Sequence, residues 1–363
     1  MLSLIAFIFV LSVLVIVHEF GHFIIAKAMK VRVETFSIGF GKKLFSFKWA
    51  DTEYRVSAIP LGGYVKMAGD NPEEKREGEK WEFLSKSLGK RAAIVAAGPI
   101  FNYVFAFLVF SLVFFIGFAV PRATIGDITD GYPAQIAGLQ AGDKILSIDG
   151  VDVSTWEEMS SIIHQKTENK EVAFNVQRGD KLMFLNIVPK VIEDKNLLGD
   201  TVKVGLIGIA PSEDVMFVRF GPGESVLRGA GQVWTVTQVT YKVLFRVITG
   251  KMSARASLTG PIGIFKITGE AAKMGFTYLL QMMALLSVSL AIINLFPIPV
   301  LDGGHLVFMI VEKIKGKPVS VKSQEIASRI GFSLLIALMM FTFYNDLMQY
   351  GFFDKAFKFF GGK

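Results

Sequence analysis

The chain has 363 residues, of which 52% are hydrophobic, and it includes 33 Phe. Its mean hydropathy of +0.46 is too high for a water-soluble protein of this length and fits a polytopic membrane protein with some water-exposed mass. The formal net charge of +7 fits Lys and Arg beside membrane helices better than a nucleic-acid site, so we expect no nucleic-acid partner. Because the chain has no Cys, disulfides and thiolate ligands are excluded, and any metal must be bound by His and carboxylates.

The first predicted element is a transmembrane helix over residues 1–30 that carries an HEFGH motif at residues 18–22. His18 and His22 lie on one face of such a helix and can share one tetrahedral metal ion. Glu19 is offset by about 100° and is placed to act as a general base on a water molecule. An ionisable cluster in a span is costly and therefore indicates function. The segment has no basic n-region or cleavage site, so we do not expect it to be a signal peptide.

Basic residues after this helix orient it in the membrane. Lys27, Lys30 and Arg32 mark its cytoplasmic end. At 1.5 Å per residue, His18 lies roughly 25 Å along a helix that crosses a hydrocarbon core of about 30 Å. We therefore expect the N-terminus outside and the metal near the cytoplasmic face.

Residues 31–91 are predicted to contain a β region followed by a charged loop. Two strand-like stretches, 43–49 and 54–59, flank a polar turn and indicate a hairpin. One interpretation is a small cytoplasmic hairpin. The other is a sheet that dips toward the active site and pairs through its free edge with an unfolded substrate, with Tyr54 and Val56 as substrate-binding residues.

A second span is predicted over 92–120, where no side chain is charged. Gly98-Pro99 and Asn102 lie in its cytoplasmic third. Because Pro frees a backbone carbonyl and Asn is costly in lipid, we expect this face to turn toward the active site, although a simple kink is the alternative.

Residues 121–212 are less hydrophobic and rich in predicted strands. The stretch 132–150 resembles the core of a PDZ domain of the bacterial protease-associated type, and Trp156 to His164 is the expected groove helix. We find no GLGF-like carboxylate loop, and we expect His164 to be a groove or surface residue. Because the domain follows the second span, we place it on the outer face.

The third span is predicted over 278–311, after an amphipathic membrane-surface region at 213–277. Pro297 and Pro299 push their preceding residues out of the α region, so the chain should run extended there, with Asp302 in a non-helical loop. A catalytic zinc takes three protein ligands plus water, which makes Asp302 the best third ligand and His305 its rival.

The rest of the chain completes a polytopic α-helical membrane protein with four transmembrane helices, a membrane-associated β-hairpin or sheet and one extracytoplasmic α+β PDZ domain. A basic cytoplasmic loop is predicted over 312–328, a fourth span over 329–347 and a tail over 348–363.

Three features together resemble the site-2 protease family: HEFGH in a first span, NLFPIPVLDGG at the end of a third, and a PDZ domain between them. The resemblance covers nearly the whole chain, including GFG, PLGGYV and LTGPIGI, although well-known members have two PDZ domains. It implies Zn²⁺ bound by His18, His22 and Asp302, with Glu19 as base, and Asn294 against the substrate backbone. We expect Pro297 and Pro299 to line the same substrate path.

The predicted function is an intramembrane zinc metalloprotease of the bacterial cytoplasmic (inner) membrane. Its expected partners are the lipid bilayer and single-span substrates, such as an anti-sigma factor or remnant signal peptides, which are cut after a site-1 trimming step. The PDZ domain is a further expected point of contact with a peptide or substrate. One alternative is a membrane PDZ scaffold with a structural metal, which has no use for Glu19. The other is a metal transporter, which would carry polar residues along its spans and not at one depth.

Overall fold

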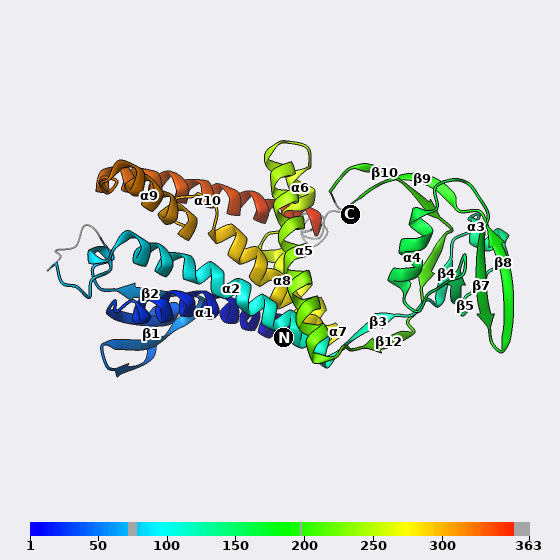
Figure 1. Cartoon of the computed structure of the whole chain (residues 1–363), viewed down its shortest axis with the longest axis horizontal. Coiled ribbons are helices and arrows are strands. Elements are labelled where there is room, and N and C mark those ends of the chain that lie inside the picture. The colour runs from blue at the N-terminus through cyan, green and yellow to red at the C-terminus, as the bar shows by residue number, and fades with distance from the viewer. Residues whose placement is uncertain (72–77, 197, 352–363) are drawn as a thin grey trace, which may run out of the picture. The chain divides into compact units, whose positions relative to one another are not determined.

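The computed structural model describes residues 1–71, 78–196 and 198–351, and the charged stretch 72–77 lies outside this set. The chain divides into two compact units, which we describe separately (Figure 1). The membrane unit comprises Met1–Val113, Pro222–Leu244 and the chain from Ser253, and the second unit comprises Phe114–Gly221 and Phe245–Met252.

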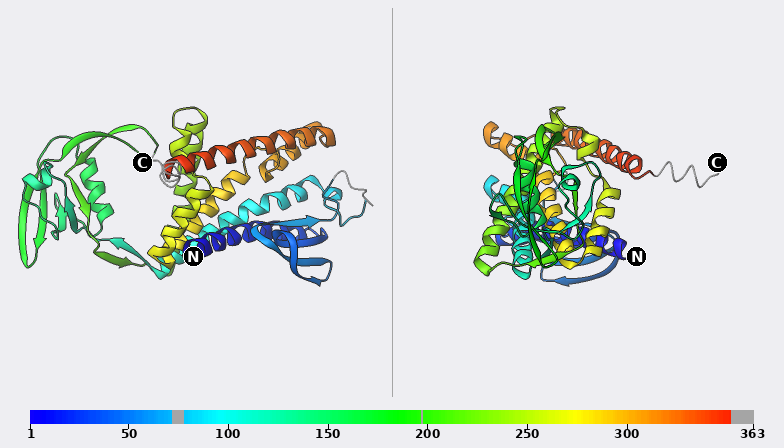
Figure 2. Two further views of the ribbon diagram at one scale, coloured as in Figure 1. Left: turned by 180° about the vertical axis from the view of Figure 1, so that it is seen from behind. Right: turned by 90° about the vertical axis from the view of Figure 1, so that its right-hand side faces the viewer.

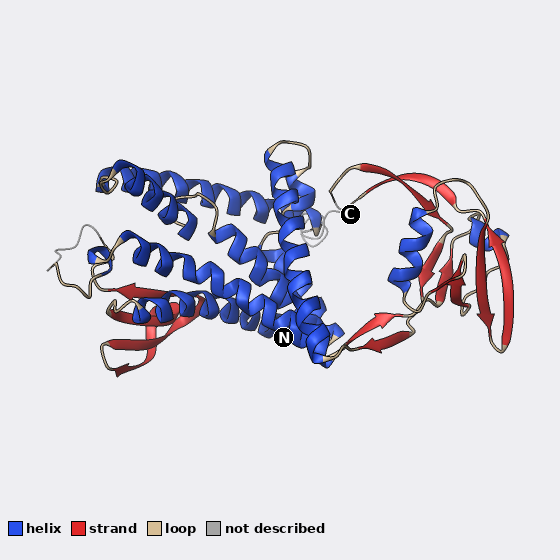
Figure 3. Ribbon diagram, viewed as in Figure 1, coloured by secondary structure: helices blue, strands red, loops and turns tan. Residues whose placement is uncertain are grey.

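Within the described residues, four helices are long and apolar enough to cross a membrane (blue in Figure 3): α1 (Leu2–Ala28), α2 (Leu88–Ile116), α8 (Phe276–Asn294) and α10 (Val321–Gln349). Large apolar side chains on them face outward, while Asn102, Ser287 and Asp346 are buried among them. This pattern fits lipid as the surrounding solvent.

Three of these helices have bounds that differ from the expected ones. The third span, expected over 278–311, is the helix α8, which ends at Asn294. The second helix ends at Ile116, because Gly117 takes a positive φ of 91° and residues 118–121 form a strand. The fourth begins at Val321, since the Ser320 side chain caps it by accepting from the Ser323 N–H. Part of the expected cytoplasmic loop is therefore helical.

Two long strands, β1 (Val33–Trp49) and β2 (Thr52–Met67), form one sheet beside α1 (Figure 1). Phe36 lies opposite both Tyr54 and Val65 in the register. The order of the segments across the sheet is therefore 43–48, 53–57, 33–38 and 63–67. The predicted hairpin is present, but it forms only half of this sheet.

Further helices join these elements. They are α5 (Pro222–Ile248), α6 (Ala254–Ser257), α7 (Pro261–Met274) and α9 (Asp302–Lys315). The Asp346 carboxylate of α10 caps α7 across the fold: it accepts from the N–H groups of Gly260 at 3.0 Å and Gly263 at 2.8 Å. Helix α7 in turn packs on α1, with the Phe7 and Phe265 rings 5.6 Å apart.

The second unit is a small α+β domain whose core is apolar, including Ile145, Ile148, Met159 and Phe174. Its four-stranded sheet has the order β6-β5-β7-β8, and α4 (Trp156–Gln165) is its longest helix. The strands and helices of this unit are drawn in cyan-green to green in Figure 2. This content fits the predicted PDZ domain. The sheet strands are β5 (Lys144–Ile148), β6 (Val151–Asp152), β7 (Val172–Arg178) and β8 (Lys181–Ile187).

Three strand pairs and a short helix, α3 (Pro133–Ile136), complete this unit. The pairs are β9 (Lys190–Lys195) with β10 (Thr201–Leu206), β4 (Ile125–Ile128) with β11 (Ile209–Pro211), and β3 (Phe118–Pro121) with β12 (Val215–Val218). Because β3 and β12 are the first and last strands of this unit, the chain enters and leaves its β structure at one antiparallel pair.

Candidate metal centre

Three potential ligand atoms converge between α1 and the start of α9. The Nε2 atoms of His18 and His22 are 3.2 Å apart, and Asp302 Oδ2 lies 3.1 Å from the first and 3.5 Å from the second. Both histidines are only 9% exposed, and Asp302 Oδ2 is buried without a hydrogen-bond partner. An orphaned carboxylate oxygen facing two imidazole nitrogens fits a zinc ion, whose catalytic sites use three such ligands and one open position.

The chain reaches Asp302 through an irregular segment that the prolines enforce. Helix α8 ends at Asn294, and Val300 takes an unusual φ of 111° before α9 starts. The expectation of a non-helical loop at Asp302 is wrong, because Asp302 is the first residue of α9. The helix can restart there because Gly303 fits against the Phe296 carbonyl oxygen, which a Cβ would approach to 2.2 Å. A carboxylate in the first turn of a helix is also favoured by the helix dipole.

His305, the rival ligand, lies one turn further along α9. Within the described residues, the group that can hold one metal ion consists of His18, His22 and Asp302 and does not include His305. The His305 ring instead lies edge-on to Phe308, with centroids 6.4 Å apart.

A cavity of about 460 Å³ opens onto this cluster. Glu19 and Asn294 line it together with the three candidate ligands. The sheet also lines it, through Phe40 and the 62–65 segment of β2. A Cβ at Gly63 would lie 3.3 Å from Glu19 Cγ, so the strand runs directly beside the candidate base.

Four of the predicted substrate-binding residues do not line this cavity. Tyr54 and Val56 lie on the middle segment of the sheet, which has paired neighbours on both sides, so its backbone has no free edge for a substrate. Pro297 and Pro299 shape the segment before α9 and lie outside the cavity lining.

Helix α2 packs directly against the histidine pair. Gly98 lies against both rings, because a Cβ there would be 2.4 Å from His22 Nε2. The Ile94 carbonyl oxygen lies 2.9 Å from His22 Nδ1, and the Asn102 amide lies 3.2 Å from His18 Nδ1. The sequence indicated that Gly98, Pro99 and Asn102 turn toward the active site, because Pro and Asn are unfavourable in a span. It did not indicate that Gly98 and Asn102 contact the histidines.

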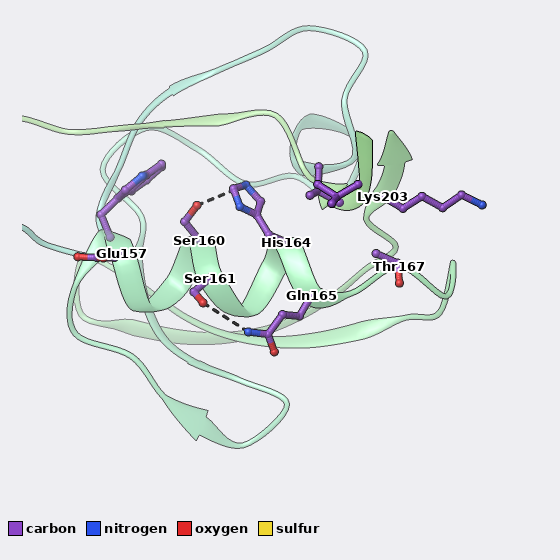
Figure 4. A pocket seen from close by; sticks show the side chains of 10 residues that line it. Glu157, Ser160, Ser161, His164, Gln165, Thr167 and Lys203 are labelled. Carbon is purple, nitrogen blue, oxygen red and sulfur yellow. Dashed lines mark hydrogen bonds between the residues drawn. The ribbon is translucent and has the colours of Figure 1, made fainter. Parts of the chain in front are cut away.

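A second cavity, of about 750 Å³, lies in the other unit between α4 and β10 (Figure 4). His164 lies on α4, where its Nε2 is 3.5 Å from Ser160 Oγ, and it belongs to no metal cluster within the described residues. The segment 205–208, which reads GLIG, lines an adjoining cavity of about 100 Å³ with Met159 and Ile163 of α4. Gly205 and Leu206 are the last residues of β10, and Ile207 and Gly208 join it to the next strand. The expectation that the domain lacks a GLGF-like carboxylate loop stays a prediction.

Comparisons with known proteins agree with these features. The model of peptidase family M50 matches residues 6–338. A protein of Brucella suis biovar 1 named as a zinc metalloprotease is 38% identical over 361 residues, which cover 95% of each chain. The regulator of sigma-E protease RseP of Escherichia coli K12 is 33% identical over 450 residues, which cover 96% of this chain and 98% of that protein.

Among solved structures, the PDZ domain of an SdrC-like protein from Listeria monocytogenes matches with 28% sequence identity and a TM-score of 0.19. The match covers 26% of this chain and 88% of that one.

Proposed function

Since this chain belongs to peptidase family M50 and is a zinc metalloprotease, we propose that it cleaves transmembrane segments of single-span proteins at the cavity formed by α1, the sheet and the start of α9. The observation that carries the proposal is the convergence of His18, His22 and Asp302 in a cavity that Glu19 also lines. A structural metal would need no acidic side chain beside it.

In this proposal His18, His22 and Asp302 hold the zinc ion. When bound, zinc acidifies water and polarises the carbonyl to be attacked. Glu19 lies one residue after His18 on α1, so its carboxylate reaches the same cavity without being a ligand. Its carboxylate oxygen takes the proton from the attacking water and later delivers it to the leaving amine nitrogen.

The substrate has to be unwound before it can be cut. A helix hides its carbonyl groups in i to i−4 hydrogen bonds, so the scissile carbonyl is released only when the local helix opens. The 62–65 segment of β2 runs along the cavity, and we propose that it accepts the extended chain by strand addition. Asn294, which lines the same cavity, donates its side-chain N–H to a substrate carbonyl oxygen.

We also propose the surroundings of the reaction. The zinc lies near the cytoplasmic face of the bacterial inner membrane, and the second unit, which we call the PDZ-like unit, lies outside. The basic residues Lys27, Lys30 and Arg32 at the end of α1 support this orientation. A relative is named as a regulator of sigma-E, which supports an anti-sigma factor as one substrate; remnant signal peptides are another. In both cases a first protease would trim the outer part before this enzyme cuts.

The proposal is tested with Glu19→Gln and a model single-span substrate in detergent. We expect cleavage to fall by at least about 10²- to 10⁴-fold, the usual contribution of a general base, while the zinc content stays the same. Glu325→Gln is the matched control, because Glu325 forms only an exposed i, i+4 ion pair with Arg329 and should leave cleavage unchanged. Full turnover by the Glu19 variant would contradict the mechanism.

A further inference from the structure

One face of α2 contacts the outer nitrogens of both candidate zinc-binding histidines. Ile94, Gly98 and Asn102 are spaced by four residues and therefore lie along one line on the helix. Ile94 O lies 2.9 Å from His22 Nδ1, and the Asn102 side chain lies 3.2 Å from His18 Nδ1. Gly98 between them lets the helix approach, since a Cβ there would be 2.8 Å from His18 Cε1.

The contact at His22 fixes the tautomer of that ring. A backbone carbonyl oxygen only accepts hydrogen bonds, so His22 Nδ1 carries the proton and donates it to Ile94 O. His22 Nε2 is then left with its lone pair facing Asp302, as a zinc ligand requires. Metal-binding histidines almost always donate their other ring N–H in this way, to a carbonyl, a carboxylate or water.

His18 needs the same tautomer, since its Nε2 faces the same carboxylate oxygen at 3.1 Å. Its Nδ1–H must then find an acceptor, and the side chain next to it is that of Asn102, which is fully buried. In the structure the amide nitrogen of Asn102 lies next to His18 Nδ1, while its oxygen, Oδ1, is buried without a partner. Two donors would face each other in this arrangement.

We propose that Asn102 is a positioning residue for the zinc site, and that its amide oxygen accepts a hydrogen bond from His18 Nδ1–H when zinc is bound. The amide reaches this state by a half turn that exchanges its oxygen and nitrogen without changing its shape. Either orientation leaves one amide atom unpartnered, but only the proposed one pairs a donor with an acceptor at His18. The inference rests on the proposed ligand set.

The backbone of Asn102 is held independently of His18. Ser287 of α8 donates to the Asn102 carbonyl oxygen at 2.8 Å, and Ser287 is fully buried. This bond ties α2 to α8 but does not reach the imidazole. Ser287→Ala therefore removes a buried hydrogen bond at the same residue and leaves the proposed acceptor in place, which makes it the matched control.

The experiment measures zinc affinity by chelator competition and the visible spectrum of the cobalt-loaded protein, in full-length variants in detergent. Asn102→Leu removes the acceptor and should weaken zinc binding by about 10- to 100-fold, the usual cost of losing such a partner, with an altered cobalt spectrum. Asn102→Asp keeps an acceptor and should retain the wild-type affinity and spectrum. Ser287→Ala should change neither.

Three results would overturn the proposal. The first is wild-type zinc affinity in Asn102→Leu. The second is an equal loss in Asn102→Asp, which would mean that the amide donates or only fills space. The third is an equal loss in Ser287→Ala, which would indicate a general effect on packing. If Asn102→Leu does not fold, Asn102→Asp decides, since retained affinity supports an acceptor and lost affinity contradicts it.

His18→Ala separates this inference from the ligand assignment on which it rests. Unchanged zinc affinity in that variant would show that the ligand set is wrong, and the proposal for Asn102 would fall with it. Loss of zinc in His18→Ala together with full affinity in Asn102→Leu would leave the ligand set intact and reject only the role of Asn102.

Discussion

Asp143 in the PDZ-like unit and Asp302 in the membrane unit both carry a largely buried carboxylate, but they differ in their hydrogen-bond partners. In the PDZ-like unit, Asp143 is fully buried and both of its oxygens are bonded to Arg178 at 2.7 Å. In the membrane unit, Asp302 faces two imidazoles, and its Oδ2 has no hydrogen-bond partner. A carboxylate whose partners are complete stabilises the fold, whereas one left incomplete between histidines is suited to a cation.

The two units also differ in which side chains they bury. The PDZ-like unit buries apolar side chains such as Phe174 and Ile145, as expected for a domain in water. The membrane unit exposes Ile5, Leu108 and Met340 by 56% to 66%, and it buries polar side chains such as Asn102 and Ser287 among apolar ones. One chain thus follows two rules of burial, because its two units face different solvents.

The largest effect on zinc affinity is expected from removing the Asp302 carboxylate. Asp302→Ala leaves two histidines and should lower zinc affinity by more than about 100-fold, since even outer partners of a ligand cost 10- to 100-fold. His305→Ala, one turn along α9, should retain zinc. The measurement is zinc stoichiometry after chelator competition, and the reverse result would identify His305 as the third ligand.

A somewhat smaller effect on zinc affinity is expected from a substitution in α2, the helix that packs against the two histidines. Gly98→Ala places a Cβ where the structure leaves 2.4 Å to His22 Nε2, so one ring has to move out of the cluster. We expect zinc affinity to fall by about 10- to 100-fold. Gly89→Ala on the same helix is the control, because no atom lies within 4 Å of its Cβ position. Equal affinities in the two variants would show that α2 does not hold the rings in place.

At Asp143 we expect a loss of stability without a loss of zinc. Asp143→Ala removes two acceptors of Arg178 and leaves the Gly138 carbonyl oxygen. The Arg178 side chain is 30% exposed and therefore regains some water, so the cost should be about 1–3 kcal/mol. Hydrogen exchange in residues 122–212 should become faster, while zinc affinity stays unchanged. Asp180→Ala, at an exposed turn, serves as the control. A drop in zinc affinity in Asp143→Ala would mean that the two units are energetically coupled.

The sequence specified the metal cluster better than its surroundings. The i, i+4 spacing of His18 and His22 is a property of one helix, and the prolines forced the chain out of helix before Asp302, so both follow from local rules. The restart of α9 at Asp302 depends on glycines that fit against distant carbonyls. The assignment of Tyr54 and Val56 to a free edge failed for a related reason, because the register brings 33–38 against the hairpin, and register is a long-range property.

The smallest effect on chemistry is expected from removing the PDZ-like unit, and the structure shows where to cut. Pro121 and Val215 lie opposite each other in the β3–β12 pair, so a two-residue Asn-Gly turn can join them and replace residues 122–214. The unit lies outside in our proposal while the zinc lies near the cytoplasmic face, so it supplies no catalytic group. It can act as an obstacle to bulky substrates or as a docking site for a peptide.

We favour the obstacle, since an obstacle explains a preference for trimmed substrates by size alone. The shortened enzyme should then cleave a short single-span substrate at a rate within about 2- to 3-fold of the full chain, and it should also cleave an untrimmed substrate that the full chain rejects. Both substrates are compared with both enzymes after zinc content has been matched.

If the preference for trimmed substrate survives the deletion, the element that excludes untrimmed substrates lies elsewhere, and the amphipathic α5 is the first candidate. If cleavage of the short substrate is lost as well, the unit docks substrates or braces the fold. In that case the GLIG segment beside α4 is where peptide binding should be tested first, because it lines a cavity with the groove helix.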